Sequence, residues 1–214
     1  MIKSSTDNRT RRIYLFVFLV LPIYILATQA MKPLAPYYSR MLCAVANVVS
    51  GYNPITGDTR RYEFDEGNIK GHIEFTIRTR SQPSGRRMPV GLIWGSRLAH
   101  FSLPIWVALI LATPVGGWRR KLVYLFLGWL IVLAGQILGL YMQTMLGKLA
   151  VLDKLARQGE YHITKTEQYL LIWEYVFSLR FGATLVPILT WMVIGLPRLI
   201  KPRKREDIPP QNEG

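Results

Sequence analysis

Charged and apolar residues are segregated along this chain, and this segregation constrains the fold more than any other feature of the sequence. Half of the residues are hydrophobic, yet the formal net charge is +14, and the lysines and arginines stand beside the apolar runs rather than among them. Soluble domains disperse their charges over the whole chain. Segregation into blocks is typical of an integral membrane protein, in which apolar blocks cross the bilayer and basic blocks stay at its edge.

Four apolar runs in this chain have the length of a transmembrane helix. Roughly 20 residues of helix cross the hydrocarbon of a bilayer, and roughly 17 to 25 are tolerated. We expect the spans at residues 13–30, 98–115, 122–146 and 169–196, of which the second only narrowly reaches this length. The predicted fold class is therefore mainly α and integral to the membrane, with four transmembrane helices.

Basic clusters next to these runs predict the orientation in the membrane. The clusters lie within 3–12, 119–121 and 198–205, and they share one side of the bilayer only if all four runs cross it. The positive-inside rule then places both termini in the cytoplasm. The connecting segments are a cytoplasmic N-terminus 1–12, an extracytoplasmic segment 31–97, a cytoplasmic turn 116–121, an extracytoplasmic helical hairpin tip 147–168 and a basic, disordered cytoplasmic tail 197–214.

The first run allows a second interpretation. A basic start, an apolar core and the residues "ATQA" at 27–30 also fit a cleavable signal peptide. The run is long and this cleavage motif is mediocre, so we favour a retained anchor. Sequencing the N-terminus of the mature protein distinguishes the two.

The extracytoplasmic segment begins with a predicted amphipathic helix. In "APYYSRMLCAVANVVSGY" apolar residues recur with helical spacing, Pro36 suits the first turn, and Gly51 suits the end. Cys43 is expected off the apolar stripe, beside Arg40, Ala46 and Asn47. We expect this helix to lie on the outer membrane face or against neighbouring helices. The stripe consists of Tyr38, Met41, Leu42, Val45, Val48 and Val49.

The residues after this helix alternate with period two and predict a small sheet. We expect strands near 61–64 and over 69–80, a turn at 65–68, and a third strand at "MPVGLIW", 88–94. Two or three strands with one apolar face are marginal alone. The sheet must therefore cover another part of this chain, the membrane surface or a partner. Its apolar face carries Ile73, Phe75 and Ile77, and its polar face His72, Glu74, Thr76 and Arg78.

A basic loop, "RTRSQPSGRR", joins the second and third strands. It holds Arg78, Arg80, Arg86 and Arg87. One interpretation is a site for an anionic ligand, such as lipid head groups or an acidic partner. The other is an ordinary solvated hairpin loop.

The third and fourth runs predict a pair of helices that extends beyond the bilayer. Helical spacing continues from the third run through Leu149, Leu152 and Leu155, and Gly159 is a natural stop. The residues 164–167, "TKTE", fit a capping box that opens the next helix. Within the membrane we expect helix contacts or partner and lipid contacts at Gly135 and Gly139, which have GxxxG spacing, and at Gln136, Gln143, Glu174 and Arg180.

Motifs that would indicate catalysis are scarce in this sequence. The three histidines show no metal-ligand spacing, and no nucleophile elbow or phosphate-binding loop is present, so we expect no metal and no cofactor. One conceivable constellation combines Cys43 as nucleophile, His100 as base and Arg180 as cationic stabiliser, although nothing in the sequence brings them together. The single cysteine excludes an intramolecular disulfide. The basic residues do not form an aromatic-basic surface, so no nucleic-acid partner is expected.

The amino-acid sequence of the C-terminal half resembles that of a known family. The run "FSLPIWVALILATP" (101–114), the basic turn that follows it and "GQILGLYMQ" (135–143) resemble the exosortase H-associated membrane proteins. This resemblance implies an accessory role in a bacterial inner-membrane system that processes C-terminally tagged exported proteins, with an exosortase as partner. It supplies no catalytic residues. Exosortases themselves carry a cysteine in an Ala-Cys-Ser-Gly context, whereas Cys43 stands in "MLCAVA".

The leading hypothesis is therefore a non-enzymatic accessory protein of the bacterial inner membrane. It would contact membrane lipids and a protein partner, in an exosortase-linked or another envelope sorting or export system. Two alternatives remain open: a membrane enzyme that uses Cys43 at the outer interface, and a small oligomeric transporter or channel subunit. The sequence identifies neither the substrate nor the oligomeric state.

Overall fold

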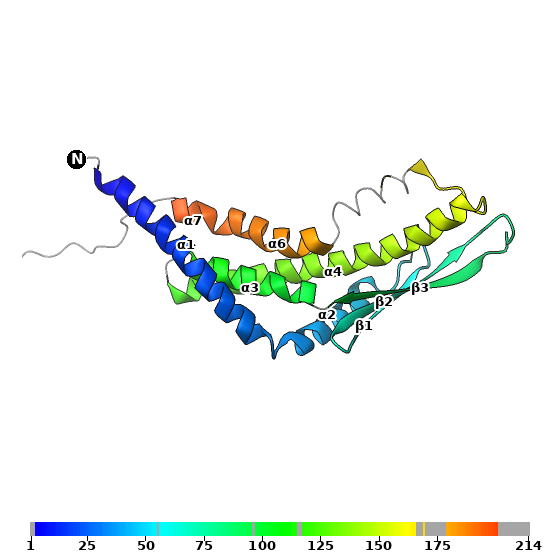
Figure 1. The fold of residues 1–214 in the computed structure, drawn as a ribbon, viewed down its shortest axis with the longest axis horizontal. Helices are drawn as coiled ribbons and strands as arrows, with labels where there is room; N and C mark the ends of the chain where they lie inside the picture. The colour runs from blue at the N-terminus through cyan, green and yellow to red at the C-terminus, as the bar shows by residue number, and fades with distance from the viewer. Residues whose placement is uncertain are drawn as a thin grey trace, which may run out of the picture.

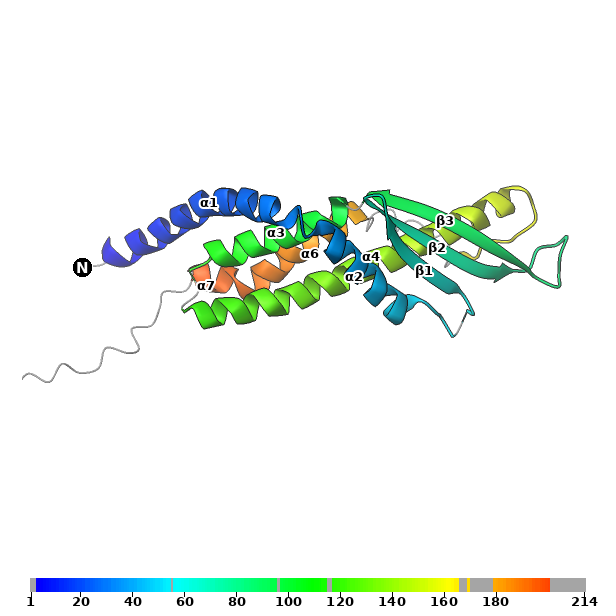
Figure 2. The same ribbon diagram turned by 90° about the horizontal axis from the view of Figure 1, so that it is seen from below.

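The computed structural model describes residues 3–54, 56–95, 97–114, 117–165, 169 and 179–200. Within these residues the protein is mostly helical, with one small sheet, and it is elongated (Figure 1). The helices gather at the end of the molecule that holds the N-terminus, and the sheet lies toward the opposite end, beside one long helix (Figure 2).

Two of the described helices are long and apolar enough to cross a membrane. Helix α1, Lys3–Met31, contains such a stretch at Thr10–Met31, and helix α4, Trp118–Arg157, is 40 residues long. Large apolar side chains of α1, among them Phe18 and Leu26, are exposed. This exposure is expected of a helix that faces lipid, because lipid tails are as apolar as leucine.

The second and fourth predicted spans are represented by shorter helices. Helix α3, Arg97–Ala112, and helix α6, Leu179–Ile194, have 16 residues each, about 24 Å at the helical rise of 1.5 Å per residue. A short helix α7, Leu196–Ile200, follows α6. The residues 170–178, which belong to the predicted fourth span, lie outside the described part of the chain, and so do two of the four residues of the predicted capping box at 164–167.

Small residues on α4 allow the helices of the bundle to approach closely. A Cβ atom at Gly128 would overlap the ring of Trp106 in α3, and one at Gly135 would lie 3.1 Å from the Val186 side chain in α6. The Trp106 indole N–H donates to the backbone carbonyl of Leu125 at 3.2 Å. Close contact and satisfied polar groups are the two sources of helix association that remain in an apolar solvent.

The sheet has three antiparallel strands in the order β1-β2-β3. They are β1, Thr59–Asp65; β2, Asn68–Ile77; and β3, Arg86–Gly95, so all three predicted strands are present. Glu66 and Gly67 form the turn between β1 and β2, and both have positive φ. A two-residue turn with two positive φ angles matches the twist of a hairpin. The second strand ends at Ile77 rather than at the predicted Arg80.

The apolar face of the sheet covers the outer half of α4. Ile73, Phe75 and Ile77 are buried together with Leu149 and Leu152 of α4, while the residues between them on β2 are exposed, as the alternation predicted. Of the three surfaces that the sheet was expected to cover, it covers another part of this chain. Helix α4 therefore runs unbroken from the helix bundle to the sheet (Figure 1).

Helix α2, Ala35–Ser50, confirms the predicted helix but not its predicted buried face. Cys43 and Ala46, expected off the stripe, are buried at 4% and 0% exposure, whereas Val48 and Val49 are exposed. The physical reason is that α2 packs closely on α4 and β1, and small side chains permit this approach better than valines do. The prediction for Cys43 was therefore wrong.

Candidate functional site

Helix α2, strand β1 and helix α4 meet in a polar junction beneath the sheet. Asn47 forms two hydrogen bonds with the backbone of Tyr62: its Oδ1 accepts from the Tyr62 N–H at 2.7 Å, and its Nδ2 donates to the Tyr62 carbonyl at 2.9 Å. The Tyr62 hydroxyl lies 3.3 Å from the Thr144 hydroxyl of α4. A single tyrosine of β1 therefore connects the strand to both helices.

Three charged residues are enclosed at this junction. Lys148 of α4 donates to the Asp58 carboxylate at 2.7 Å, and the Arg60 guanidinium lies 3.7 Å from the same oxygen. Asp58 and Arg60 are 1% and 5% exposed. Arg60 also stacks on the Tyr141 ring, with its Cζ 4.4 Å from the ring centroid, which is a cation–π contact. Two cations share one carboxylate, so the cluster keeps a net positive charge in a desolvated place.

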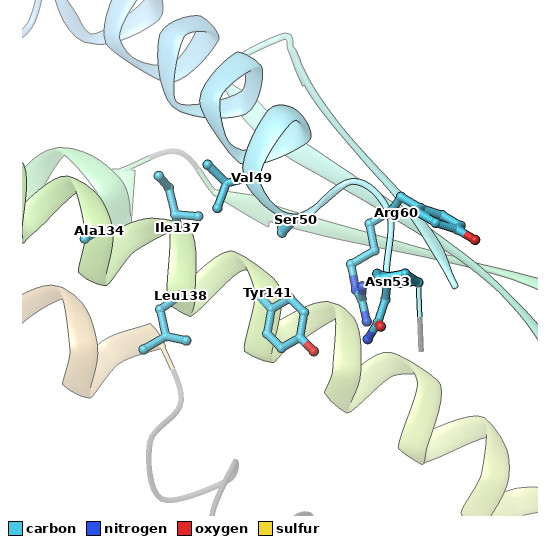
Figure 3. A pocket seen from close by; sticks show the side chains of 10 residues that line it. Val49, Ser50, Asn53, Arg60, Ala134, Ile137, Leu138 and Tyr141 are labelled. Carbon is cyan, nitrogen blue, oxygen red and sulfur yellow. The ribbon is translucent and has the colours of Figure 1, made fainter. Parts of the chain in front are cut away.

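A groove of about 490 Å³ opens beside this junction. It lies between the end of α2 and α4, with Ile137 and Leu138 on one side and Val49 on the other (Figure 3). Arg60 and Tyr141 stand at its end toward the sheet. The walls are almost wholly apolar, and this volume lies within the usual range of about 300 to 1,000 Å³ for ligand sites.

The two glutamines predicted on the third span differ in their surroundings. Gln136 is buried, and its Oε1 accepts a hydrogen bond from the Tyr38 hydroxyl of α2. Burial raises the pKa of Tyr38 above its ordinary value, and the hydrogen bond to Gln136 partly offsets this. The Oε1 atom of Gln143 is buried and finds no partner among the described residues. Gln136 thus joins two helices of this chain.

The conceivable catalytic constellation is not assembled around a reactive thiol. Cys43 is buried, and burial, with a contribution from the negative charge of Glu63, raises the pKa of its thiol to about 11. A nucleophilic cysteine needs the opposite shift, since the thiolate is the reactive form. His100 lies in α3 and Arg180 in α6, and their side chains are not among those described. Within the described residues, no three of the His, Cys, Asp and Glu side chains cluster as metal ligands would.

The remaining predicted contact residues occupy separate places. Gly135 contacts Val186 of α6, so it packs within the chain, and Gly139 is half-buried on α4. Glu174 lies outside the described residues. Arg78 and Arg80 are exposed on the loop between β2 and β3, and Arg86 and Arg87, predicted in the same loop, are exposed at the start of β3.

Hydrogen bonds connect the basic loop to Glu160, just after the end of α4. The Glu160 carboxylate accepts from the Ser81 hydroxyl at 2.7 Å and from the Ser81 backbone N–H at 3.2 Å. The Arg80 backbone N–H donates to the Glu160 carbonyl at 3.1 Å. The hydrogen bonds from Ser81 hold the pKa of Glu160 below its ordinary value. The loop thus has a defined position relative to the long helix.

Sequence reasoning missed the Asp58, Arg60 and Lys148 cluster. Asp58 lies in a turn and Lys148 on a helix ninety residues away, so no local spacing connects them. The only available signal was Lys148 itself, a charge on the helix whose neighbours Leu149 and Leu152 were expected to face inward.

These features define a mostly helical protein with two candidate membrane spans and a small sheet packed on the longer of them. The chain belongs to the exosortase H-associated membrane protein family, whose model matches residues 7–196. This family is the one that the sequence resembled, and the match extends well beyond the C-terminal half. No functionally curated protein and no solved structure is significantly similar to the chain.

Proposed function

We propose that this protein is a non-enzymatic partner subunit of exosortase H in the bacterial inner membrane. It crosses the membrane four times, with both termini in the cytoplasm and the segment 31–97 outside. The name of the family supports the association with exosortase H. The basic clusters next to the four apolar runs support the orientation.

The observation that carries this proposal is the continuity of α4. Its first half packs in the helix bundle against α3 and α6, and its second half supports the sheet. A continuous helix is a rigid element of fixed length. A partner protein bound to α4 in the membrane is therefore held at a fixed distance from a molecule bound at the sheet. This geometry suits a subunit that positions another membrane protein relative to its exported substrate.

The membrane-facing side of α4 supplies a surface for such a partner. Phe126, Leu130 and Leu138 are large, apolar and exposed on the same side of the helix. Ala134 lies among them and forms part of the groove. Because apolar side chains gain little from each other in lipid, helices associate where a small residue permits close packing. We therefore place the exosortase contact at the groove around Ala134.

The two rival functions have less support. An enzyme that uses Cys43 would need an accessible thiolate, and this thiol is buried with a raised pKa. A transport pathway along the third span would need polar groups open to water, and Gln136 is buried in a hydrogen bond with Tyr38. Within the part of the chain that the structure describes, neither rival has an observation in its favour.

Co-purification from membranes in mild detergent tests the proposal. The full-length chain, expressed together with exosortase H, is expected to retain it, and failure of the wild-type pair to co-purify contradicts the proposal. Ala134→Trp fills the groove and is expected to weaken the complex. Val17→Trp is the matched control, because Val17 is exposed on a different membrane helix. Equal effects of the two variants would remove the groove from the proposal.

Cysteine accessibility in intact cells tests the orientation. Single cysteines are introduced into a Cys43→Ser background, which then has no other thiol. A membrane-impermeant thiol reagent is expected to label position 84 in the loop of the sheet and to leave position 120 unlabelled until the membrane is opened. The reverse pattern, or labelling of both positions, contradicts the four-span orientation.

A further inference from the structure

Four arginines in the loop between β2 and β3 and at the start of β3 form a concentrated positive surface at the far end of the molecule, which we call the arginine tip. The residues 78–87 hold four arginines and no acidic residue, and all four arginines are exposed. None of them forms a salt bridge within the described part of the chain. The nearby carboxylate of Glu160 is occupied by Ser81.

Strand register places two of these arginines on one face of the hairpin. Thr76 pairs with Arg87, and Arg78 follows two residues after Thr76, so Arg78 and Arg87 are diagonal neighbours. Two guanidinium groups on the same face at this spacing repel each other. An anion between them removes the repulsion, and guanidinium groups match carboxylates in a bidentate geometry.

The backbone of the arginine tip is held in position before any ligand binds. The two hydrogen bonds from Ser81 to Glu160 and the backbone bond from Arg80 connect it to the end of α4. Gly85 has a φ of 87°, and a Cβ there would lie 3.7 Å from the Arg78 Cγ, so the loop backbone runs close to the stem of Arg78. A surface held in this way loses less conformational entropy on binding than a free loop does.

The length of α4 separates the arginine tip from the lipid head groups. The predicted crossing begins at residue 122, after the basic turn, and ends at residue 146. The helix continues to Arg157, about 16 Å further at 1.5 Å per residue. The head groups occupy about 5 to 8 Å of this distance. The remainder is about one Debye length at physiological salt, so attraction to the lipid surface is weakened by screening.

We propose that the arginine tip binds an acidic segment of a polypeptide outside the membrane. This inference rests on the orientation given under the proposed function. Of the two anionic ligands that the sequence allowed for this loop, the distance along α4 disfavours lipid head groups of the same membrane and favours an acidic protein segment. Complementary charge of this kind steers association and selects partners.

Binding of a fluorescent poly-glutamate peptide to the full-length protein in nanodiscs tests the inference. The double variant Arg78→Glu/Arg87→Glu is expected to lower the affinity at least about tenfold and to abolish the salt dependence that is expected of the wild type. Arg40→Glu/Arg61→Glu is the matched control, because it makes the same change in net charge at two exposed arginines closer to the membrane. Equal loss in both double variants overturns the inference.

A dye at position 84 distinguishes the two anionic sources. Ser84→Cys in a Cys43→Ser background gives one labelling site on the arginine tip. The dye is expected to respond to added poly-glutamate in zwitterionic nanodiscs and to be indifferent to anionic lipid in the same disc. A response to anionic lipid alone overturns the inference and identifies head groups as the ligand. Neither measurement uses exosortase H. The proposal for the arginine tip can therefore be contradicted while the proposed complex with exosortase H is supported, and the complex can be contradicted while the arginine tip is supported.

Discussion

Asp58 and Lys148, ninety residues apart in the chain, form a salt bridge of 2.7 Å beneath the sheet. Arg60 approaches the same carboxylate from β1. The carboxylate therefore links the strand that begins the sheet to the helix that supports it. Because the pair is desolvated, its two members depend on each other far more than exposed charges do.

Asp58→Asn is expected to destabilise the protein by about 3 to 5 kcal/mol, because it leaves the buried Arg60 and the half-buried Lys148 without their counter-charge. Asp65→Asn is the matched control: Asp65 forms an exposed pair with Lys70, and such pairs contribute about 1 kcal/mol or less. Unfolding of the two variants in detergent, followed by the fluorescence of the tryptophans, gives both values. Equal stabilities would show that the junction is not the link between sheet and helix.

Gly128→Ala is expected to separate α3 from α4, since the added methyl group would overlap the Trp106 ring. Overpacking of this kind costs about 1 to 3 kcal/mol. Gly135→Ala is a graded control, because its methyl group would lie 3.1 Å from Val186 and needs only a small adjustment. The melting temperatures in detergent should fall in the order wild type, Gly135→Ala, Gly128→Ala. A Gly128→Ala variant as stable as the wild type would contradict the contact.

Cys43 is expected to resist thiol reagents in the folded protein. With a pKa of about 11, about one thiol in ten thousand is ionised at pH 7, and the side chain is buried as well. Labelling with a maleimide should be slow in mild detergent and complete after unfolding in dodecyl sulfate. Cys43→Ser should support exosortase-dependent processing as the wild type does. Fast labelling of the native thiol, or loss of processing, would restore the enzymatic hypothesis.

Acidification is expected to release the arginine tip from α4. The folded pKa of Glu160 lies below its ordinary value of 4.5, so its contribution is present above pH 4.5 and is lost as the pH falls through the lowered pKa. The protection of the Ser81 amide against hydrogen exchange, relative to the intrinsic rate at each pH, should therefore fall in this acidic range. Glu160→Gln should show fast exchange already at neutral pH, whereas Glu74→Gln, on the exposed face of β2, should not. Slow exchange in Glu160→Gln would show that the backbone bond from Arg80 suffices.

Much of the local structure was predictable because it depends on neighbouring residues. The alternation around Ile73 placed one face of β2 inside, and the structure confirms it. The helical spacing beyond residue 146 and the glycine at 159 predicted where α4 ends, and it ends at Arg157. The buried face of α2 was mispredicted, since hydrophobicity alone ranks Val48 above Cys43, whereas close packing on α4 favours the smaller side chain.

The sequence by itself determined the class of the protein, because apolar runs and basic clusters are properties of short segments and need no knowledge of how the segments meet. Only the tertiary structure decided what the sheet covers, which charges are enclosed and where the four arginines stand relative to the long helix. These features depend on contacts between residues far apart in the chain, such as Asp58 with Lys148 and Ser81 with Glu160. No periodicity in the sequence predicts such contacts, because they form only when the helix bundle and the sheet pack along the same helix, α4.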